Sequence, residues 1–130
     1  MSKKRLFFTL IEVIVVIVVI IILYGIGAPV FRRAVEVAKD KEAENMLSLI
    51  ASAQRMYRLK YDEYFREKTS DLDVIKRNLS IDLPTGEWNY EIGQDKDNPS
   101  NYKAIAWSDK RKWYWEITPT DDRPQKVIIP

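Results

Sequence analysis

A long hydrophobic segment near the start of the chain contains one acidic residue. Residues 6–31 form this segment, and within it only Glu12 carries a formal charge. About 20 apolar residues are enough to cross the hydrocarbon core of a bilayer, so the segment is long enough to span a membrane. A carboxyl group at membrane depth costs about 2.5–3.5 kcal/mol on insertion scales, and such groups usually have a partner and a function. What this chain does therefore depends on what Glu12 pairs with.

The length of the segment also argues against its removal as an ordinary signal peptide. The apolar region of a secretory signal is typically about 7–15 residues and ends at a small-residue cleavage site. Here the segment is longer, contains an acid and ends in the Gly- and Pro-containing residues 25–29. Three cations in residues 3–5 precede it, and Arg32 and Arg33 follow it. The positive-inside rule with the short leader predicts that the N-terminus is cytoplasmic and that the chain after Arg33 is exported.

Composition restricts the function classes. The chain contains no cysteine and no histidine, so it has no disulfide and lacks the commonest general base and metal ligand. No Ser/Lys or paired-carboxylate arrangement stands out, and we expect no enzymatic activity. A net charge of +2 is too small to indicate nucleic acid by itself.

Helical periodicity continues beyond the hydrophobic segment. After Pro29, apolar residues recur at spacings of three and four with charged residues opposite them, which predicts one helix from about Thr9 to about Tyr64. Its first half is hydrophobic on all sides and its second half is amphipathic. Gly25, Gly27 and Pro29 are expected to break the helix, since proline removes a hydrogen bond and glycine is about 1 kcal/mol worse than alanine. Either a kink at the membrane boundary or a functional extension joint would fit this pattern.

The C-terminal part of the chain predicts a short helix and a sheet. Ser70 and the acid three residues later indicate a helix start, with the helix ending near Leu79. Period-two alternation then predicts antiparallel strands at 88–93, 102–107 and 113–117, with a fourth at 126–129. The amphipathic half of the long helix would cover the apolar face of this sheet. The predicted fold class is therefore α+β, a long N-terminal helix packed on a small antiparallel sheet of three to four strands.

The N-terminal pieces together resemble the type IV pilin and pseudopilin family. They are a basic leader, the motif Phe8-Thr9-Leu10-Ile11-Glu12-Val13, an apolar helix and Pro29, twenty-one residues after Phe8. In that family a prepilin peptidase cuts just before the phenylalanine, which becomes an N-methylated first residue. The resemblance implies a leader at residues 1–7, a transmembrane and assembly helix at 8–31, and an exported globular domain at 32–130. One departure is Phe7, which stands where the family usually has glycine. Either the peptidase tolerates it, or cleavage is slow, or the chain stays uncut.

The family also implies a role for Glu12. The start of a helix carries partial positive charge, and a freed amine at Phe8 would add a full one. Glu12, one turn later, would pair with the N-terminal amine of an adjacent subunit and so fix the register of assembly. In an uncut chain Glu12 would instead protonate or find Thr9 or another partner.

The implied function is that of a structural subunit of an extracellular type IV pilus-like filament. The chain would be a single-pass inner-membrane precursor that then polymerises through its N-terminal helix. Its partners would be further copies in a helical filament, the prepilin peptidase, the inner-membrane assembly machinery, and minor pilins or pseudopilins. The alternatives are a pseudopilin of a type II secretion system, acting in the periplasm, and a membrane-anchored exported binding module.

A basic turn flanked by aromatics is a second candidate site. Lys110, Arg111 and Lys112 lie between Trp107 and the strand at 113–117. Single-stranded nucleic acid binds to surfaces that combine stacking and positive charge, and some members of the family take up DNA. One short patch falls short of the clustered basic footprint of such proteins. We interpret the basic run as a solvated hairpin turn, and nucleic acid is not an expected partner.

A polar loop at residues 94–101 offers candidate metal ligands. Asp95 and Asp97 are at alternate positions, which suits calcium, and some secretion pseudopilins bind calcium in a loop of this region. The glycine and terminal glutamate of the calcium-loop pattern are absent. Asp and Asn are also ordinary turn formers. We therefore expect no cofactor, with calcium as the alternative.

Overall fold

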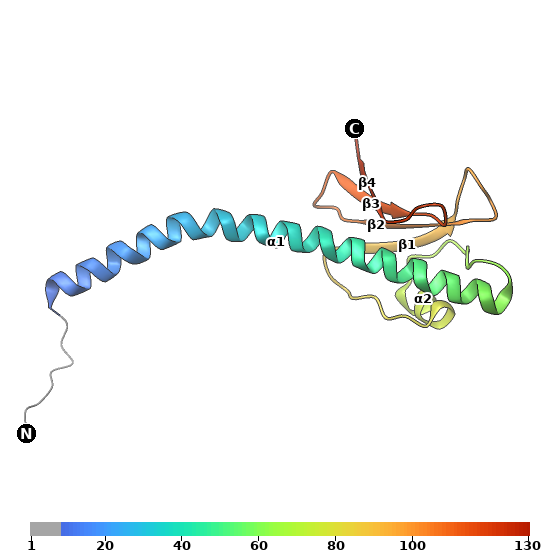
Figure 1. Cartoon of the computed structure of the whole chain (residues 1–130), viewed down its shortest axis with the longest axis horizontal. Helices are drawn as coiled ribbons and strands as arrows, with labels where there is room; N and C mark the ends of the chain where they lie inside the picture. The colour runs from blue at the N-terminus through green and yellow to red at the C-terminus, as the bar shows by residue number, and fades with distance from the viewer. Residues whose placement is uncertain (1–8) are drawn as a thin grey trace, which may run out of the picture. The chain divides into compact units, whose positions relative to one another are not determined.

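The computed structural model describes residues 9–130, which fall into two compact units divided between Lys39 and Asp40. The elements follow in the order α1 (Leu10–Tyr61), α2 (Leu72–Leu79), β1 (Asn89–Gln94), β2 (Tyr102–Trp107), β3 (Trp113–Ile117) and β4 (Gln125–Ile128). Figure 1 shows this order along the chain. The predicted α+β fold, a long helix with a small antiparallel sheet, is confirmed.

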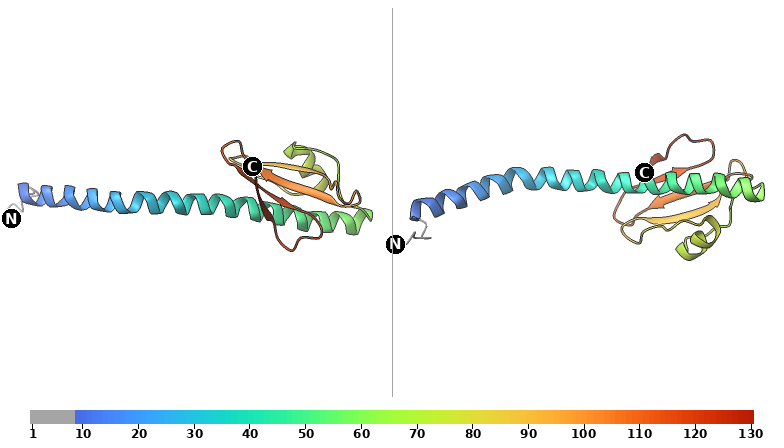
Figure 2. Two further views of the ribbon diagram at one scale, coloured as in Figure 1. Left: turned by 90° about the horizontal axis from the view of Figure 1, so that it is seen from above. Right: turned by 60° about the horizontal axis from the view of Figure 1, so that its bottom comes forward.

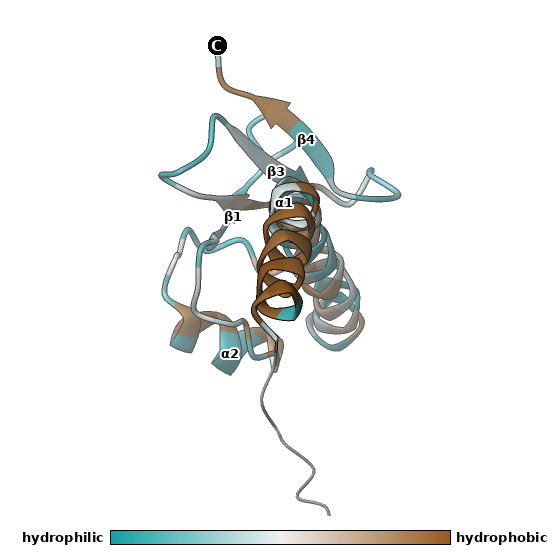
Figure 3. Cartoon of the chain, turned by 90° about the vertical axis from the view of Figure 1, so that its left-hand side faces the viewer, coloured by the Kyte–Doolittle hydropathy of each residue, from teal (hydrophilic) through white to brown (hydrophobic). Residues whose placement is uncertain are grey.

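The first unit contains the apolar half of α1. This part of the helix is long and apolar enough to cross a membrane, and none of its apolar window is buried. Figure 3 shows it in the hydrophobic colour. A signal sequence, which also lies near the N-terminus, meets the same criteria of length and composition.

The predicted helix break is not present as an interruption in this structure. Residues 25–29 are helical, with Pro29 inside α1. Proline has no N–H to donate to the carbonyl four residues earlier, which here belongs to Gly25, so α1 lacks one hydrogen bond at this point. A Cβ added at Gly25 or Gly27 would meet no atom of the described chain within 4 Å, so packing among residues 9–130 does not require these glycines.

The second unit begins with the amphipathic part of α1, which covers one face of the sheet (Figure 2). The four strands form an antiparallel meander in the order β1-β2-β3-β4. Alternate strand residues face the helix and are buried, with the small Ala104 and Ala106 in the middle of the sheet. The helix side of this core is made of Ala43, Leu47, Ile50, Ala51 and Ala53.

The ends of the two helices differ slightly from the prediction. α1 ends at Tyr61 rather than near Tyr64, because Asp62 adopts a left-handed conformation (φ 60°) and donates its N–H to the carbonyl of Arg58 at 2.8 Å. The N-cap of α2 is Asp71 rather than Ser70. Its carboxylate accepts the backbone N–H of Asp73 at 2.9 Å, which satisfies one of the free donors of the first turn.

A buried glutamine ties the end of α1 to the chain that follows it. The side-chain amide of Gln54 is fully buried and makes two hydrogen bonds to the backbone of Phe65. Its Nε2 donates to the Phe65 carbonyl at 2.7 Å, and its Oε1 accepts the Phe65 N–H at 2.8 Å. The Gln54 amide thus gives the backbone N–H and carbonyl of Phe65 the hydrogen bonds that a neighbouring strand would otherwise supply. The ring of Phe65 lies in the core. Sequence periodicity gave no signal for this contact.

We expect Gln54→Ala to destabilise the protein by about 2–4 kcal/mol, because it leaves the buried N–H and carbonyl of Phe65 unsatisfied. Urea unfolding followed by circular dichroism measures the loss. Gln94→Ala is the matched control, since Gln94 also donates to a backbone carbonyl, that of Pro99 at 2.7 Å, but is exposed. The control should change stability by no more than about 0.5 kcal/mol. Equal losses in the two variants would contradict the role assigned to Gln54.

Candidate functional site

The first turn of α1 holds the acidic residue that the sequence singled out. Thr9 precedes the helix and caps it: its carbonyl accepts the N–H of Val13 at 3.1 Å, and its hydroxyl accepts the backbone N–H of Glu12 at 3.2 Å. Thr9 therefore contacts the backbone of Glu12 and not the carboxylate. Its role as a partner of that carboxylate stays a prediction.

The carboxylate of Glu12 is exposed and makes no hydrogen bond or ion pair with any residue between 9 and 130. Its position in the first turn is electrostatically favourable, because the unpaired N–H groups of a helix start carry partial positive charge. Chemically, the site can accept a cation or an amine from outside this helix. The predicted processing residues Phe7 and Phe8 lie outside the described residues.

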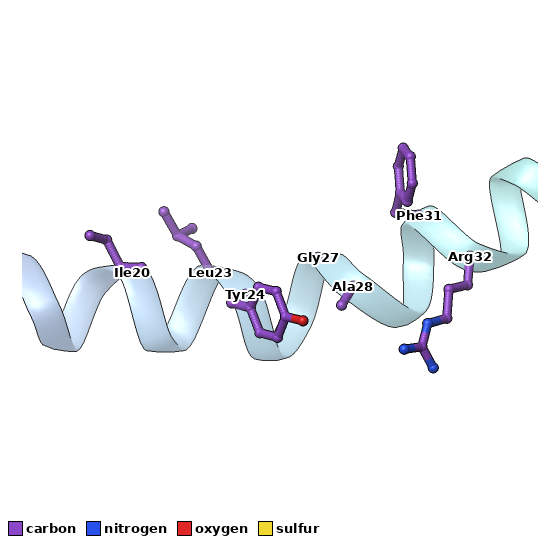
Figure 4. Close-up of a pocket in the computed structure, with 7 residues that line it drawn as sticks. All are labelled: Ile20, Leu23, Tyr24, Gly27, Ala28, Phe31 and Arg32. Atoms are coloured by element: carbon purple, nitrogen blue, oxygen red, sulfur yellow. The ribbon is translucent and has the colours of Figure 1, made fainter.

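A notch on the helix surface lies at the predicted break. Gly27 and Ala28 form its floor, and the larger side chains of Tyr24, Phe31 and Arg32 surround it (Figure 4). Small residues on a helix allow another backbone to approach closely, which in membranes is a common basis of helix association. Gly25, Gly27 and Pro29, the residues predicted to break the helix, all lie within α1. An added Cβ at Gly25 or Gly27 would contact no other element of the described chain.

The basic turn after β2 differs from the solvated hairpin that we predicted. Lys110 and Lys112 are exposed, but Arg111 is buried. Its guanidinium lies 3.1 Å from the carboxylate of Glu87, and both side chains are largely buried, at 4% and 13% exposure. The prediction was wrong for Arg111 because the largely buried carboxylate of Glu87, which is distant in the sequence, compensates its charge.

Arg111 belongs to a cluster of alternating cations and tryptophans. Its guanidinium carbon lies 5.3 Å from the ring centre of Trp88 and 5.2 Å from that of Trp113. The ammonium of Lys126 lies 4.3 Å from the ring centre of Trp113 and 5.9 Å from that of Trp115. Cation–π contacts of this kind are worth about 0.5–2 kcal/mol each. The cluster joins β3 and β4 to the segment before β1, so Arg111 and Lys126 have a structural role.

The cluster also reaches α1 through Asp40. The indole Nε1 of Trp113 donates to the carboxylate of Asp40 at 3.1 Å, and Lys126 lies 3.9 Å from the same carboxylate. The structure buries Trp115 and half-buries Trp113. Asp40, Glu87 and Lys126 were not predicted from the sequence, because their pairing depends on contacts between distant segments.

The loop after β1 uses its acids to form turns. Asp95 is buried, its carboxylate accepts the N–H of Asp97 at 3.1 Å, and its N–H donates to the carbonyl of Asn101 at 3.0 Å. This is the turn-forming use of Asp. Among residues 9–130 no group of three or more His, Cys, Asp or Glu side chains could hold a metal ion. The Asp95 carboxylate thus has a structural role in this turn, and the expectation that the chain binds no calcium stays a prediction.

Two core tyrosines titrate far from neutrality. Burial raises the pKa of Tyr102 to about 12. Burial, and secondarily the negative charge of Glu42, raises the pKa of Tyr90 further. Both phenols therefore stay protonated at physiological pH, and neither supplies a phenolate for chemistry.

Comparisons of the chain with family models, with curated proteins and with solved structures find no match. The pilin and pseudopilin resemblance therefore rests on the N-terminal motif and on the α+β architecture alone.

We expect Arg111→Ala to destabilise the protein by about 3–5 kcal/mol, because it leaves the carboxylate of Glu87 buried without its cation. Chemical unfolding monitored by tryptophan fluorescence measures the effect. Lys110→Ala is the control, since Lys110 is an exposed cation of the same turn and should cost no more than about 0.5 kcal/mol. Similar losses from both substitutions would show that the turn, rather than the buried pair, determines stability.

Proposed function

We propose that this chain is a structural subunit of an extracellular type IV pilus-like filament, inserted first in the inner membrane and then polymerised through the N-terminal half of α1. The observation that carries the proposal is a helix whose apolar surface is exposed all round and which holds a single acid, Glu12, in its first turn. The exported unit would be displayed outside the membrane. The proposal requires no catalytic group.

The exposed apolar surface of α1 supplies the driving force. Thirteen large hydrophobic residues (10, 11 and 13–23) are each at least 42% exposed. Covering them would yield on the order of 10–20 kcal/mol, since full burial of one aliphatic side chain is worth about 1.5–3 kcal/mol. Lipid can cover this surface before assembly and the helices of other copies can cover it afterwards. The same surface therefore fits both stages of the proposed pathway.

Glu12 supplies specificity rather than bulk stability. Surrounded by Ile and Val, its carboxylate is costly unless a cation neutralises it. Cleavage before Phe8 would create such a cation, a free amine close to the start of the helix. A neighbouring copy that brings its amine to Glu12 would fix the axial register, because a slip by one turn would leave both charges without a partner.

We expect Glu12→Gln to leave membrane insertion intact but to lower the amount of subunit in sheared extracellular filaments at least tenfold. The reason is that an unpaired buried amine costs about 3–5 kcal/mol per contact, and about 1.4 kcal/mol already corresponds to a factor of ten. Immunoblots of the membrane and sheared fractions provide the measurement.

Glu44→Gln is the matched control for this experiment. Glu44 is an acid of the same helix, 3.6 Å from Lys41 in a partly exposed pair, and such pairs contribute little. Normal filaments in both variants would contradict the assembly role of Glu12. Loss of the Glu12→Gln chain from the membrane would point to an anchored binding module, in which Glu12 affects anchoring alone.

A further inference from the structure

The face of the sheet that points away from α1 carries a trough of about 440 Å³. It lies across β1, β2 and β3, whose outward side chains line it together with Lys68. Pockets of about 300–1,000 Å³ are the usual size for small ligands. No described element of the second unit covers this face.

Two aromatic residues of the trough, Trp107 and Tyr114, stand at opposite positions on neighbouring strands. Trp107 pairs with Asn89 across β1–β2, and Tyr114 pairs with Val127 across β3–β4. Extending the β2–β3 register by one residue beyond Ala106 and Trp115 places Trp107 opposite Tyr114. Opposite residues on neighbouring strands are about 4.5–5.5 Å apart. The solvent face of an antiparallel sheet is normally polar, so the helix–sheet core does not explain this aromatic pair.

Hydrogen-bond acceptors and donors surround Trp107 and Tyr114. Glu91 and Glu116 offer acceptors, while Lys68, Lys96 and Lys103 offer donors. The ammonium of Lys103 lies 3.6 Å from the carboxylate of Glu116, so part of the charge is compensated within the trough. Gly93, Gln94 and Lys96 lie at one end of the trough beside Lys68.

We infer that this trough binds a neutral oligosaccharide. The faces of Trp107 and Tyr114 offer flat apolar surfaces to the C–H faces of sugar rings, and the surrounding carboxylates, ammonium groups and amides match hydroxyls that both donate and accept.

The charges of the trough favour a neutral ligand over a charged one. Three lysines face two glutamates, which leaves only one excess positive charge. A polyanion such as single-stranded DNA requires a continuous basic groove. A peptide strand would need the free backbone groups of a sheet edge, and the trough lies on the face of the sheet. The inference is independent of filament assembly, since it uses only residues of the second unit.

Calorimetric titration of the full chain tests this inference. The detergent must carry no sugar headgroup, so a polyoxyethylene detergent is used, and the probes are cellohexaose, maltohexaose and chitohexaose. We expect saturable binding of at least one probe, with a Kd on the order of 0.1–1 mM that is unchanged between 50 and about 300 mM salt, as for an uncharged ligand. Absence of binding to all three probes would overturn the inference.

Variants then locate the site. Trp107→Ala and Tyr114→Ala should each weaken binding at least tenfold, while Trp107→Phe keeps a ring and should lose less than Trp107→Ala. Tyr61→Ala is the control, because Tyr61 is an exposed aromatic on α1, away from the trough, and its loss should not change affinity. Circular dichroism verifies that each variant is folded. Unchanged affinity in folded Trp107→Ala, or tighter and steeply salt-dependent binding of oligo-dT, would contradict an oligosaccharide site here.

Discussion

The apolar surface of the first half of α1 determines how the rest of the molecule can work. No residue between 9 and 130 buries that surface, so lipid or another polypeptide must. A single helix then meets two environments, because its second half covers a sheet in water. The second half needs only one apolar face, and its exposed side is free to carry charge. The sequence changes from all-round hydrophobicity to amphipathicity as these two environments require.

The second unit must hold its fold without disulfides, which gives its polar contacts a structural role. Gln54 binds the backbone of Phe65, and Arg111 and Lys126 alternate with tryptophans to join strands to α1 through Asp40. The contacts of Asp40 with Trp113 and Lys126, and of Arg111 with Glu87, link segments distant in sequence. In this way a small sheet with one covering helix acquires a defined register. The opposite face of the sheet is left to carry the aromatic pair of the trough.

Periodicity predicted the fold closely, because it reports which face of each element is buried. β2 and β3 begin and end where period two predicts, and β1 and β4 differ by one residue at each end. The two buried polar contacts that the sequence did not predict share one physical cause. Gln54 and Arg111 are buried polar groups whose partners come from other segments, and one-dimensional patterns treat such residues as exposed. Glu12 could be identified because a lone acid among aliphatic residues is costly wherever it lies, whereas its proposed partner belongs to another molecule.

The mass and N-terminal sequence of the chain recovered from sheared extracellular filaments test the filament account most directly. Membrane-bound chain from the same cells provides the comparison. The account predicts that chains in the sheared fraction begin at an N-methylated Phe8, in spite of Phe7 before the cleavage site, and that unprocessed precursor stays in the membrane. A chain that begins at Met1 and is confined to the membrane would contradict it, since Phe8 would then have no free amine to offer to Glu12.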